Sequence, residues 1–331
     1  MTSILQPQPY SSRHITSAPW TRCLHSRICN NSWPASSFRL PYCRKPASRA
    51  RVIVTGANSG LGLDASKHLC VLRRFRFFWQ GTALTNPDRV RLGVSRLIMA
   101  CRDQGKGQEA CKLVLDSGPQ GGASTVELWD IDMARKKSVT ASAKRASSEL
   151  DRIDGVLLNA GIDTHVFELA EGDESTLTVN VVSTYLLALA LPPELRETTK
   201  HFNTLPRLTV LGSSIHIFGP DGQLSSPPEG KVFETLSDPQ SADMTSLYVL
   251  SKLMVSLCAR ELAQHVHPNE VVVNCVNPGW CKTNLFRVDD GGLGGRTGIR
   301  LIGRTSEQGS RTLVHAITAE LHDSWEDTKL Q

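Results

Sequence analysis

This chain of 331 residues has few features of a membrane-spanning or disulfide-linked protein. No apolar run reaches the roughly 18 residues that a membrane-spanning helix needs, so we expect no membrane span. The nine cysteines are scattered and show no paired metal-type spacing, which predicts neither a metal site nor a disulfide framework. Thiols distributed in this way are typical of a reducing compartment, and we expect a cytoplasmic protein.

Acidic residues are absent from residues 1–49, which contain seven Lys or Arg and many Ser and Pro. This composition predicts a disordered basic extension without a folded role. It resembles an organellar transit peptide. It equally matches translated sequence upstream of a wrongly chosen start, because prolines and tryptophans interrupt any sustained amphipathic helix. We therefore expect the folded domain within residues 50–331.

A second basic segment, residues 73–92, contains five arginines and four aromatic residues. Removing it restores a short connection between a helix and a strand, so we interpret it as an atypical insertion or a retained intron. A nucleic-acid or membrane surface is the alternative. The formal net charge is +5, and residues 1–49 and 73–92 contribute +7 and +4, which leaves −6 for the remainder. The basic balance therefore predicts no nucleic-acid partner.

Short apolar segments alternate with helical stretches along the rest of the chain. These segments lie at 51–54, 96–100, 126–131, 155–158, 208–211 and 271–276. The alternation predicts an α/β fold, a single-domain Rossmann-type doubly wound parallel sheet. In such a sheet the ligand binds at the carboxyl ends of the strands.

A glycine-rich turn, Thr55-Gly-Ala-Asn-Ser-Gly-Leu-Gly62, follows the first predicted strand. We expect a helix from Leu61 to Leu72, so Gly56, Gly60 and Gly62 lie between that strand and this helix. Backbone N–H groups and the helix dipole then point at the turn and favour a bound pyrophosphate. The turn therefore predicts a dinucleotide site.

Tyr248 and Lys252 stand four residues apart in Tyr-Val-Leu-Ser-Lys. On a helix this spacing places both side chains on one face. A neighbouring ammonium group lowers the pKa of a phenol below its ordinary value of about 10. The pair therefore predicts a group that exchanges protons near neutral pH, although a solvated helix face carries the same spacing.

Six motifs resemble, in chain order, those of the short-chain dehydrogenase/reductase superfamily. They are Thr-Gly-x-x-x-Gly-x-Gly at 55–62, Asn159-Ala-Gly161, Asn180, Ser213-Ser214, Tyr248-x-x-x-Lys252 and Asn277-Pro-Gly279. The match runs from about residue 50 to about residue 316. Stretches such as Leu-Ile-Met-Ala-Cys-Arg-Asp and Val-Asn-Pro-Gly-Trp-Cys-Lys-Thr are similar to reductases from secondary-metabolite gene clusters of filamentous fungi.

The resemblance implies an oxidoreductase acting on a small-molecule carbonyl or alcohol. Tyr248 would protonate the carbonyl oxygen, and Lys252 would lower the tyrosine pKa and hold the nicotinamide ribose. Ser214 would polarise the substrate carbonyl, with Ser213 as the alternate. Asn180 would anchor a water in the proton relay. Reduction of a ketone or aldehyde in secondary-metabolite biosynthesis is the expected direction, and alcohol oxidation, the same chemistry reversed, stays open.

The resemblance also implies NADPH as cofactor. Arg102, and no carboxylate, ends the second predicted strand, and an arginine there pairs with the 2′-phosphate of NADP. Asp132 would accept the adenine amino group, and no metal is expected. The implied cofactor contacts are Thr55, Gly56, Ser59, Gly60, Leu61, Gly62, Arg102, Asp132, Asn159, Ala160, Gly161, Tyr248, Lys252, Pro278, Gly279 and Thr283.

Several segments around this site carry their own expectations. Residues 215–247 form a long connection that we expect to line the substrate pocket, and the glycine-rich residues 284–304 predict a lid. The resemblance places Tyr185–Leu191 near a dimer interface, so a homodimer is one expected assembly. After residue 316 the chain runs in a polar tail to Gln331, where family members continue into a final strand and helix. We therefore expect an incomplete C-terminal end and an exposed sheet edge.

Two further functions stay open at this stage. One is a catalytically impaired relative that binds nucleotide or a protein partner without turnover. The other is an RNA-binding or membrane-associated protein that acts through residues 1–92. Substrate identity and stereochemistry depend on pocket loops, and no single residue of the sequence names the ligand.

Overall fold

The computed structural model describes residues 50–70, 94–118, 124–283, 285 and 303–318. These residues belong to one unit of the chain, Pro41–Gln331. The predictions for residues 1–49, for the insertion at 73–92 and for the tail after residue 318 lie outside the described residues. The same holds for most of the predicted lid at 284–304.

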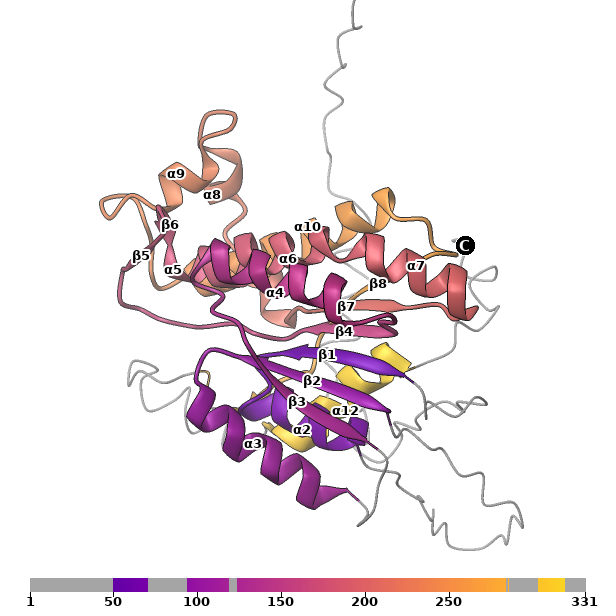
Figure 1. The fold of residues 1–331 in the computed structure, drawn as a ribbon. Helices are drawn as coiled ribbons and strands as arrows, with labels where there is room; N and C mark the ends of the chain where they lie inside the picture. Colours follow the sequence, from indigo (N-terminus) through magenta and orange to yellow (C-terminus); the bar gives the residue numbers. More distant parts are fainter. Residues whose placement is uncertain (1–49, 71–93, 119–123, 284, 286–302, 319–331) are drawn as a thin grey trace, which may run out of the picture. The chain divides into compact units, whose positions relative to one another are not determined.

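The centre of the fold is a parallel sheet of six strands in the order β3-β2-β1-β4-β7-β8 (Figure 1). The strands are β1 Arg51–Thr55, β2 Arg96–Cys101, β3 Thr125–Asp130, β4 Gly155–Leu158, β7 Arg207–Leu211 and β8 Val272–Val276. The strand order reverses between β1 and β4, and such a switch point is where doubly wound sheets bind ligands. The predicted Rossmann-type doubly wound sheet is confirmed. Among the described strands, β8 lies at one edge.

Helices cover both faces of this sheet, and Figure 1 shows α2, α3 and α12 on one face and α4, α6 and α10 on the other. Their bounds are α2 Gly60–Cys70, α3 Gln104–Ser117, α4 Lys136–Glu149, α6 Thr184–Ala190, α10 Leu247–His265 and α12 Ser306–Thr318. Alternation along β1 explains the two layers, because successive strand side chains point to opposite faces. Val52 and Val54 enter the cluster under α2 and α12, whereas Ile53 enters the cluster under α4 and α10.

A continuous helical stretch, Ser175–Phe202, is long and apolar enough to cross a membrane, because 18 consecutive residues within it have a mean hydropathy of 1.4. Of those 18 residues, 67% are buried inside the fold, as expected of a core helix. The stretch comprises α5 Ser175–Leu177, the π-helix η1 Thr178–Ser183, α6, and α7 Pro192–Phe202. The buried Glu174 carboxylate caps its start by accepting hydrogen bonds from the backbone N–H groups of residues 176 and 177.

Short elements complete the described structure. They are β5 Leu169–Ala170, β6 Asp173–Glu174, the 3₁₀ helix η2 Ser214–Phe218, α8 Gly222–Ser225, α9 Val232–Leu236, β9 Cys281–Lys282 and β10 Arg304–Thr305. Sequence patterns predicted the six long strands to within one residue but none of the two-residue strands. Those strands pair over only two residues each, which is too short to leave a periodic signal.

Candidate active site

The turn after β1 depends on glycine at each of its predicted positions. Gly56 and Gly60 have φ values of +64° and +53°, which glycine adopts without a steric penalty. A Cβ atom on Gly62 would lie 2.4 Å from the carbonyl oxygen of Gly56 and 2.5 Å from Nδ2 of Asn159. The backbone at the start of α2 therefore lies against the backbone at the end of β1 and leaves no room for a side chain at Gly62.

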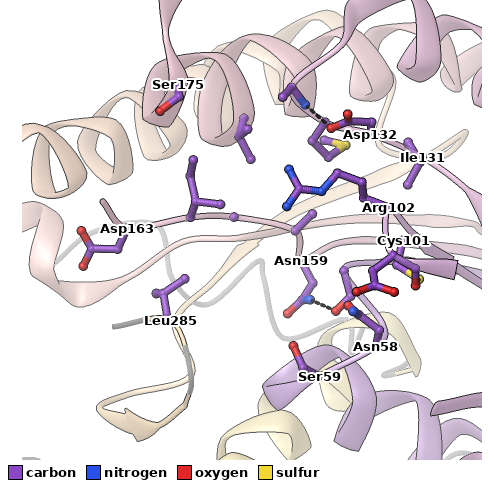
Figure 2. Close-up of a pocket in the computed structure, with 18 of the residues that line it drawn as sticks. Asn58, Ser59, Cys101, Arg102, Ile131, Asp132, Asn159, Asp163, Ser175 and Leu285 are labelled. Atoms are coloured by element: carbon purple, nitrogen blue, oxygen red, sulfur yellow. Dashed lines mark hydrogen bonds between the residues drawn. The ribbon is translucent and has the colours of Figure 1, made fainter. Parts of the chain in front are cut away.

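Hydrogen bonds between β1 and β4 hold this turn in place. Asn159 Nδ2 donates to the carbonyl oxygens of Thr55 at 2.9 Å and Gly56 at 3.2 Å. In return, Thr55 Oγ1 accepts from the backbone N–H groups of Asn159 and Ala160, both at 3.0 Å. Figure 2 shows Asn159 at the floor of the cavity beside Asn58 and Ser59. The predicted Asn159-Ala-Gly161 motif thus stabilises the switch point of the sheet.

A cavity of about 660 Å³ lies at the carboxyl ends of the strands. Among the predicted cofactor residues, those that line it are Gly56, Ser59, Gly60, Leu61, Arg102, Asp132, Asn159, Ala160, Gly161 and Thr283. Those that do not line it are Thr55, Gly62, Tyr248, Lys252, Pro278 and Gly279. The loop after β8 nevertheless reaches the glycine turn, because the Thr283 side chain comes within 3.8 Å of a Cβ atom built on Gly60.

The end of β2 supplies the cationic side of the cavity. Arg102 is exposed, and its guanidinium group extends into the cavity in Figure 2. The next residue, Asp103, caps α3 by accepting from the backbone N–H of Lys106 at 3.0 Å, and its other oxygen lies 3.3 Å from the Lys106 ammonium. Asp132 Oδ1 accepts from the backbone N–H of Ala134 at 3.0 Å. Asp103 and Asp132 are therefore partly engaged within the protein, whereas the Arg102 guanidinium group extends into the cavity.

Tyr248 lies in the first turn of α10 and Lys252 one turn later. Lys252 is only 5% exposed, and its Nζ donates to the carbonyl oxygen of Leu211 at 3.0 Å. The same Nζ lies 5.8 Å from the centroid of the Tyr248 ring. Since Leu211 and Gly161 line the cavity and a Cβ atom on Gly161 would lie 3.9 Å from Nζ, the pair stands directly behind the cavity wall.

The predicted lowering of the Tyr248 pKa is wrong for this structure. Burial raises the pKa of the Tyr248 hydroxyl above its ordinary value, and the negative charge of Asp163 raises it further. Burial also lowers the pKa of Lys252 to about 8, although Cys275 and Asp163 oppose this shift. The loss of hydration on burial disfavours the charged forms of both groups, so Tyr248 is held as the neutral phenol.

Asn180 lies in the π-helix η1, a distortion that is frequent at functional sites. Its Oδ1 accepts from the backbone N–H of Ile162, and its Nδ2 donates to the carbonyl oxygen of the same residue, both at 2.9 Å. Nδ2 also donates to Ser251 Oγ at 3.0 Å, and that hydroxyl donates to the carbonyl oxygen of Tyr248 at 2.7 Å. The Asn180 side chain thus links the cavity wall to the turn that carries Tyr248, and its water-anchoring role stays a prediction.

The two candidate serines take different positions at the end of β7. Ser213 caps η2, since its hydroxyl accepts from the backbone N–H of Ile215 at 3.3 Å. Ser214 is the first residue of η2, which packs against α10. Because Ser213 has a local capping role, Ser214 remains the better candidate for a hydroxyl that faces substrate. Residues 215–247 do not line the cavity, and their role in a substrate pocket stays a prediction.

Sequence reasoning missed two residues of this site. Ser251 is completely buried and joins Asn180 to Tyr248, and Asp163 lines the cavity. The available signals were weak: Ser251 directly precedes Lys252, and Asp163 follows Gly161 by two residues. A serine or an aspartate in such a position does not by itself indicate a contact, because the contact forms only when the chain folds.

The fold and the site define a Rossmann-type α/β protein with a Tyr–Lys pair behind a glycine-turn cavity. The chain is 36% identical over 281 residues to the short chain dehydrogenase/reductase dmxR8 of Cryptosporiopsis sp., covering 84% of this chain and 80% of that protein. It is 35% identical over 288 residues to the short chain dehydrogenase atnD of Emericella nidulans, covering 85% and 83%. The chain belongs to the short-chain dehydrogenase/reductase family of oxidoreductases, which confirms the predicted family and its fungal relatives.

Solved structures show the same fold at lower sequence identity. A short-chain dehydrogenase from Sphingobium yanoikuyae in complex with NADPH has a TM-score of 0.53 and 20% identity, over 80% of this chain and 83% of that one. A short chain dehydrogenase from Shigella flexneri complexed with NADP has a TM-score of 0.54 and 18% identity, over 84% and 93%. No established family profile matches the chain.

Proposed function

We propose that this chain is an NADPH-dependent reductase of a small-molecule ketone or aldehyde, acting in secondary-metabolite biosynthesis of the polyketide type. The observation that carries the proposal is the placement of Tyr248 and Lys252 behind one wall of a cavity whose other wall is the glycine turn. The fungal relatives named as short chain dehydrogenases support it, as do structural neighbours solved with NADPH or NADP.

The glycine turn matches the requirements of a dinucleotide pyrophosphate. Gly56 and Gly60 line the cavity without side chains, and α2 begins there with no acidic residue in its first turn. The N–H groups at the start of a helix of 11 residues therefore face the cavity without a competing negative charge. A pyrophosphate would be held by these N–H groups.

Arg102 supports NADPH rather than NADH as the cofactor. It extends from the end of β2 into the cavity, where it would pair with the 2′-phosphate of the adenosine ribose. The neighbouring carboxylate of Asp103 is occupied by the backbone and side chain of Lys106. NADPH would supply a hydride to the substrate carbonyl when bound.

The protonation of Tyr248 supports its role as the proton donor in reduction. A neutral phenol donates a proton to a carbonyl oxygen as negative charge develops there, and the raised pKa of Tyr248 keeps it neutral. Alcohol oxidation, the same chemistry reversed, would begin from the phenolate. Ser214 would donate a hydrogen bond to the same oxygen, and Lys252 is held in place by the Leu211 carbonyl.

The test is the oxidation of NADPH, compared with NADH, against a panel of aromatic and aliphatic ketones and aldehydes. Tyr248→Phe removes the proton donor and is expected to lower kcat/KM by about 10²- to 10⁴-fold. Tyr185→Phe is the matched control, because the Tyr185 hydroxyl donates to the Val255 carbonyl within the core at 2.5 Å. Activity that survives Tyr248→Phe would refute the role of Tyr248. NADPH binding without turnover of any carbonyl would instead favour a nucleotide-binding function.

A further inference from the structure

The β5–β6 hairpin and the segment that leads into α4 both contribute to the cavity lining. Glu168, Leu169 and Ala170, which are the residues of β5 and the one before it, line the cavity. Residues 131–134, which connect β3 to α4, line it as well. They include Asp132, the residue that the family resemblance assigns to the adenine amino group. The distance between these two stretches therefore sets the width of the cavity where we expect adenosine to bind.

The turn of the hairpin is bonded to the start of α4. Glu171 Oε2 accepts a hydrogen bond from the backbone N–H of Lys136, the first residue of that helix, at 2.8 Å. The first N–H groups of a helix need an acceptor from outside the helix. In the described structure α4 supplies none itself, because its N-cap residue Arg135 makes no side-chain capping bond and its first turn contains no acidic residue. Glu171, 35 residues further along the chain, provides the missing cap.

Glu171 makes this contact from an unfavourable backbone conformation. Among the described residues, only Glu171 and Asn203 combine a side chain with a positive φ, of 54° and 48°. Asn203 ends α7 in the left-handed conformation, where asparagine is common. A glutamate in this region is disfavoured relative to glycine and persists where its surroundings hold it. The bond to Lys136 is the printed contact of the Glu171 side chain that glycine could not make.

Other bonds hold the two strands of the hairpin independently of Glu171. Thr178 Oγ1 donates to the Ala170 carbonyl oxygen at 2.9 Å, and the backbone N–H of Glu174 donates to Ser237 Oγ at 2.8 Å. The Lys136 ammonium group also lies 3.3 Å from Asp173 Oδ2. Removal of the Glu171 side chain should therefore leave the hairpin folded and release only its turn from α4.

We propose that Glu171 is a positioning residue for the cofactor: by capping α4 it holds the β5–β6 hairpin at the distance from residues 131–134 at which the cavity binds the adenosine part of NADPH. This inference rests on the cofactor of the proposed function. Electrostatics alone predicts the opposite effect of Glu171, because a carboxylate repels the phosphates of NADPH and its removal would tighten binding. Positioning predicts weaker binding when the side chain is removed, so the sign of the change separates the two.

The experiment is a fluorescence titration of the full chain with NADPH. Glu171→Gly suits the positive φ but removes the cap, and the Kd is expected to rise about three- to tenfold. Glu171→Gln keeps an amide oxygen that accepts from Lys136, and its Kd should stay within about twofold of the wild type. Glu149→Ala is the matched control, because it removes a carboxylate from the other end of α4, where Glu149 accepts from Arg145 at 2.9 Å, and it should leave the Kd unchanged.

Amide hydrogen exchange of the free protein tests the structural link without the cofactor. The amides of residue 136 and of residues 169–173 should exchange faster in Glu171→Gly than in the wild type, in Glu171→Gln or in Glu149→Ala. The proposal is wrong if exchange there is unchanged, if Glu171→Gly binds NADPH as tightly as the wild type or more tightly, or if either other variant weakens binding equally. NADPH binding by the wild type without reduction of any carbonyl would overturn the reductase function alone, whereas no binding at all would overturn both.

Discussion

The two ends of the cavity are built in different ways. The glycine-turn end comes mainly from one run of the chain, residues 55–62, fixed by backbone sterics and by Asn159. The Tyr248 end joins segments that are far apart in sequence, including Ile162, Asn180, Leu211 and Ser251. The glycine-turn end is therefore determined mainly by residues that are neighbours in the sequence. The charge states at the second end depend on burial, which the whole fold determines.

The largest effect is expected from Lys252→Met, which removes the buried cation at the Tyr248 end. Activity should fall by about 10²- to 10⁴-fold, since Lys252 would hold the nicotinamide ribose. Stability should rise, because a lysine pKa lowered to about 8 corresponds to about 3 kcal/mol of destabilisation at neutral pH. Loss of the hydrogen bond to Leu211 offsets about 1 kcal/mol of this gain.

The pH dependence of that stability gain follows from the sign of the shift. The folded-state pKa of Lys252 lies below its unfolded value, so the destabilisation is full below about pH 8 and disappears as pH rises toward the ordinary lysine pKa. Denaturant unfolding of both proteins at several pH values measures the difference. The exposed Lys112→Met is the control and should change neither property. A variant less stable than the wild type at neutral pH would contradict the expectation.

Gly62→Ala tests the glycine-turn end. Its Cβ atom would lie 2.4 Å from the Gly56 carbonyl oxygen, so the turn must shift. We expect a loss of about 1–3 kcal/mol in unfolding free energy and a rise of about tenfold in the Kd for NADPH, because the N–H groups of the turn move. Gly222→Ala serves as the control, since no atom lies within 4 Å of its added Cβ. Unchanged NADPH binding by Gly62→Ala, measured by fluorescence titration, would show that the turn does not hold the cofactor.

The same contrast explains what could be predicted from the sequence. The strands and the glycine turn follow from apolar runs and from glycine positions that are contiguous in the chain. The direction of the shift in the Tyr248 pKa was predicted wrongly. The i,i+4 spacing indicates the nearby ammonium group, but it indicates neither the burial of the phenol nor the charge of Asp163. The resemblance already favoured Ser214 over Ser213, and the fold adds that Ser213 caps η2.

A smaller effect is expected from Ser251→Ala, which breaks the link between Asn180 and the Tyr248 turn. Asn180 Nδ2 loses one of its two acceptors, and a weakened buried amide costs about 1–3 kcal/mol of stability. Tyr248 then loses part of its positioning, so kcat should fall by about three- to tenfold while KM for NADPH stays constant.

Ser256→Ala is the matched control for this change. Ser256 Oγ donates to the Lys252 carbonyl at 3.0 Å on the same helix, but it makes no hydrogen bond to Asn180 among the described contacts. If Ser251→Ala and Ser256→Ala lowered kcat equally, the loss would reflect general loosening of α10. A loss confined to Ser251→Ala would show that the Tyr248 end depends on a contact across 71 residues of sequence, whereas the glycine-turn end depends mainly on its own neighbours.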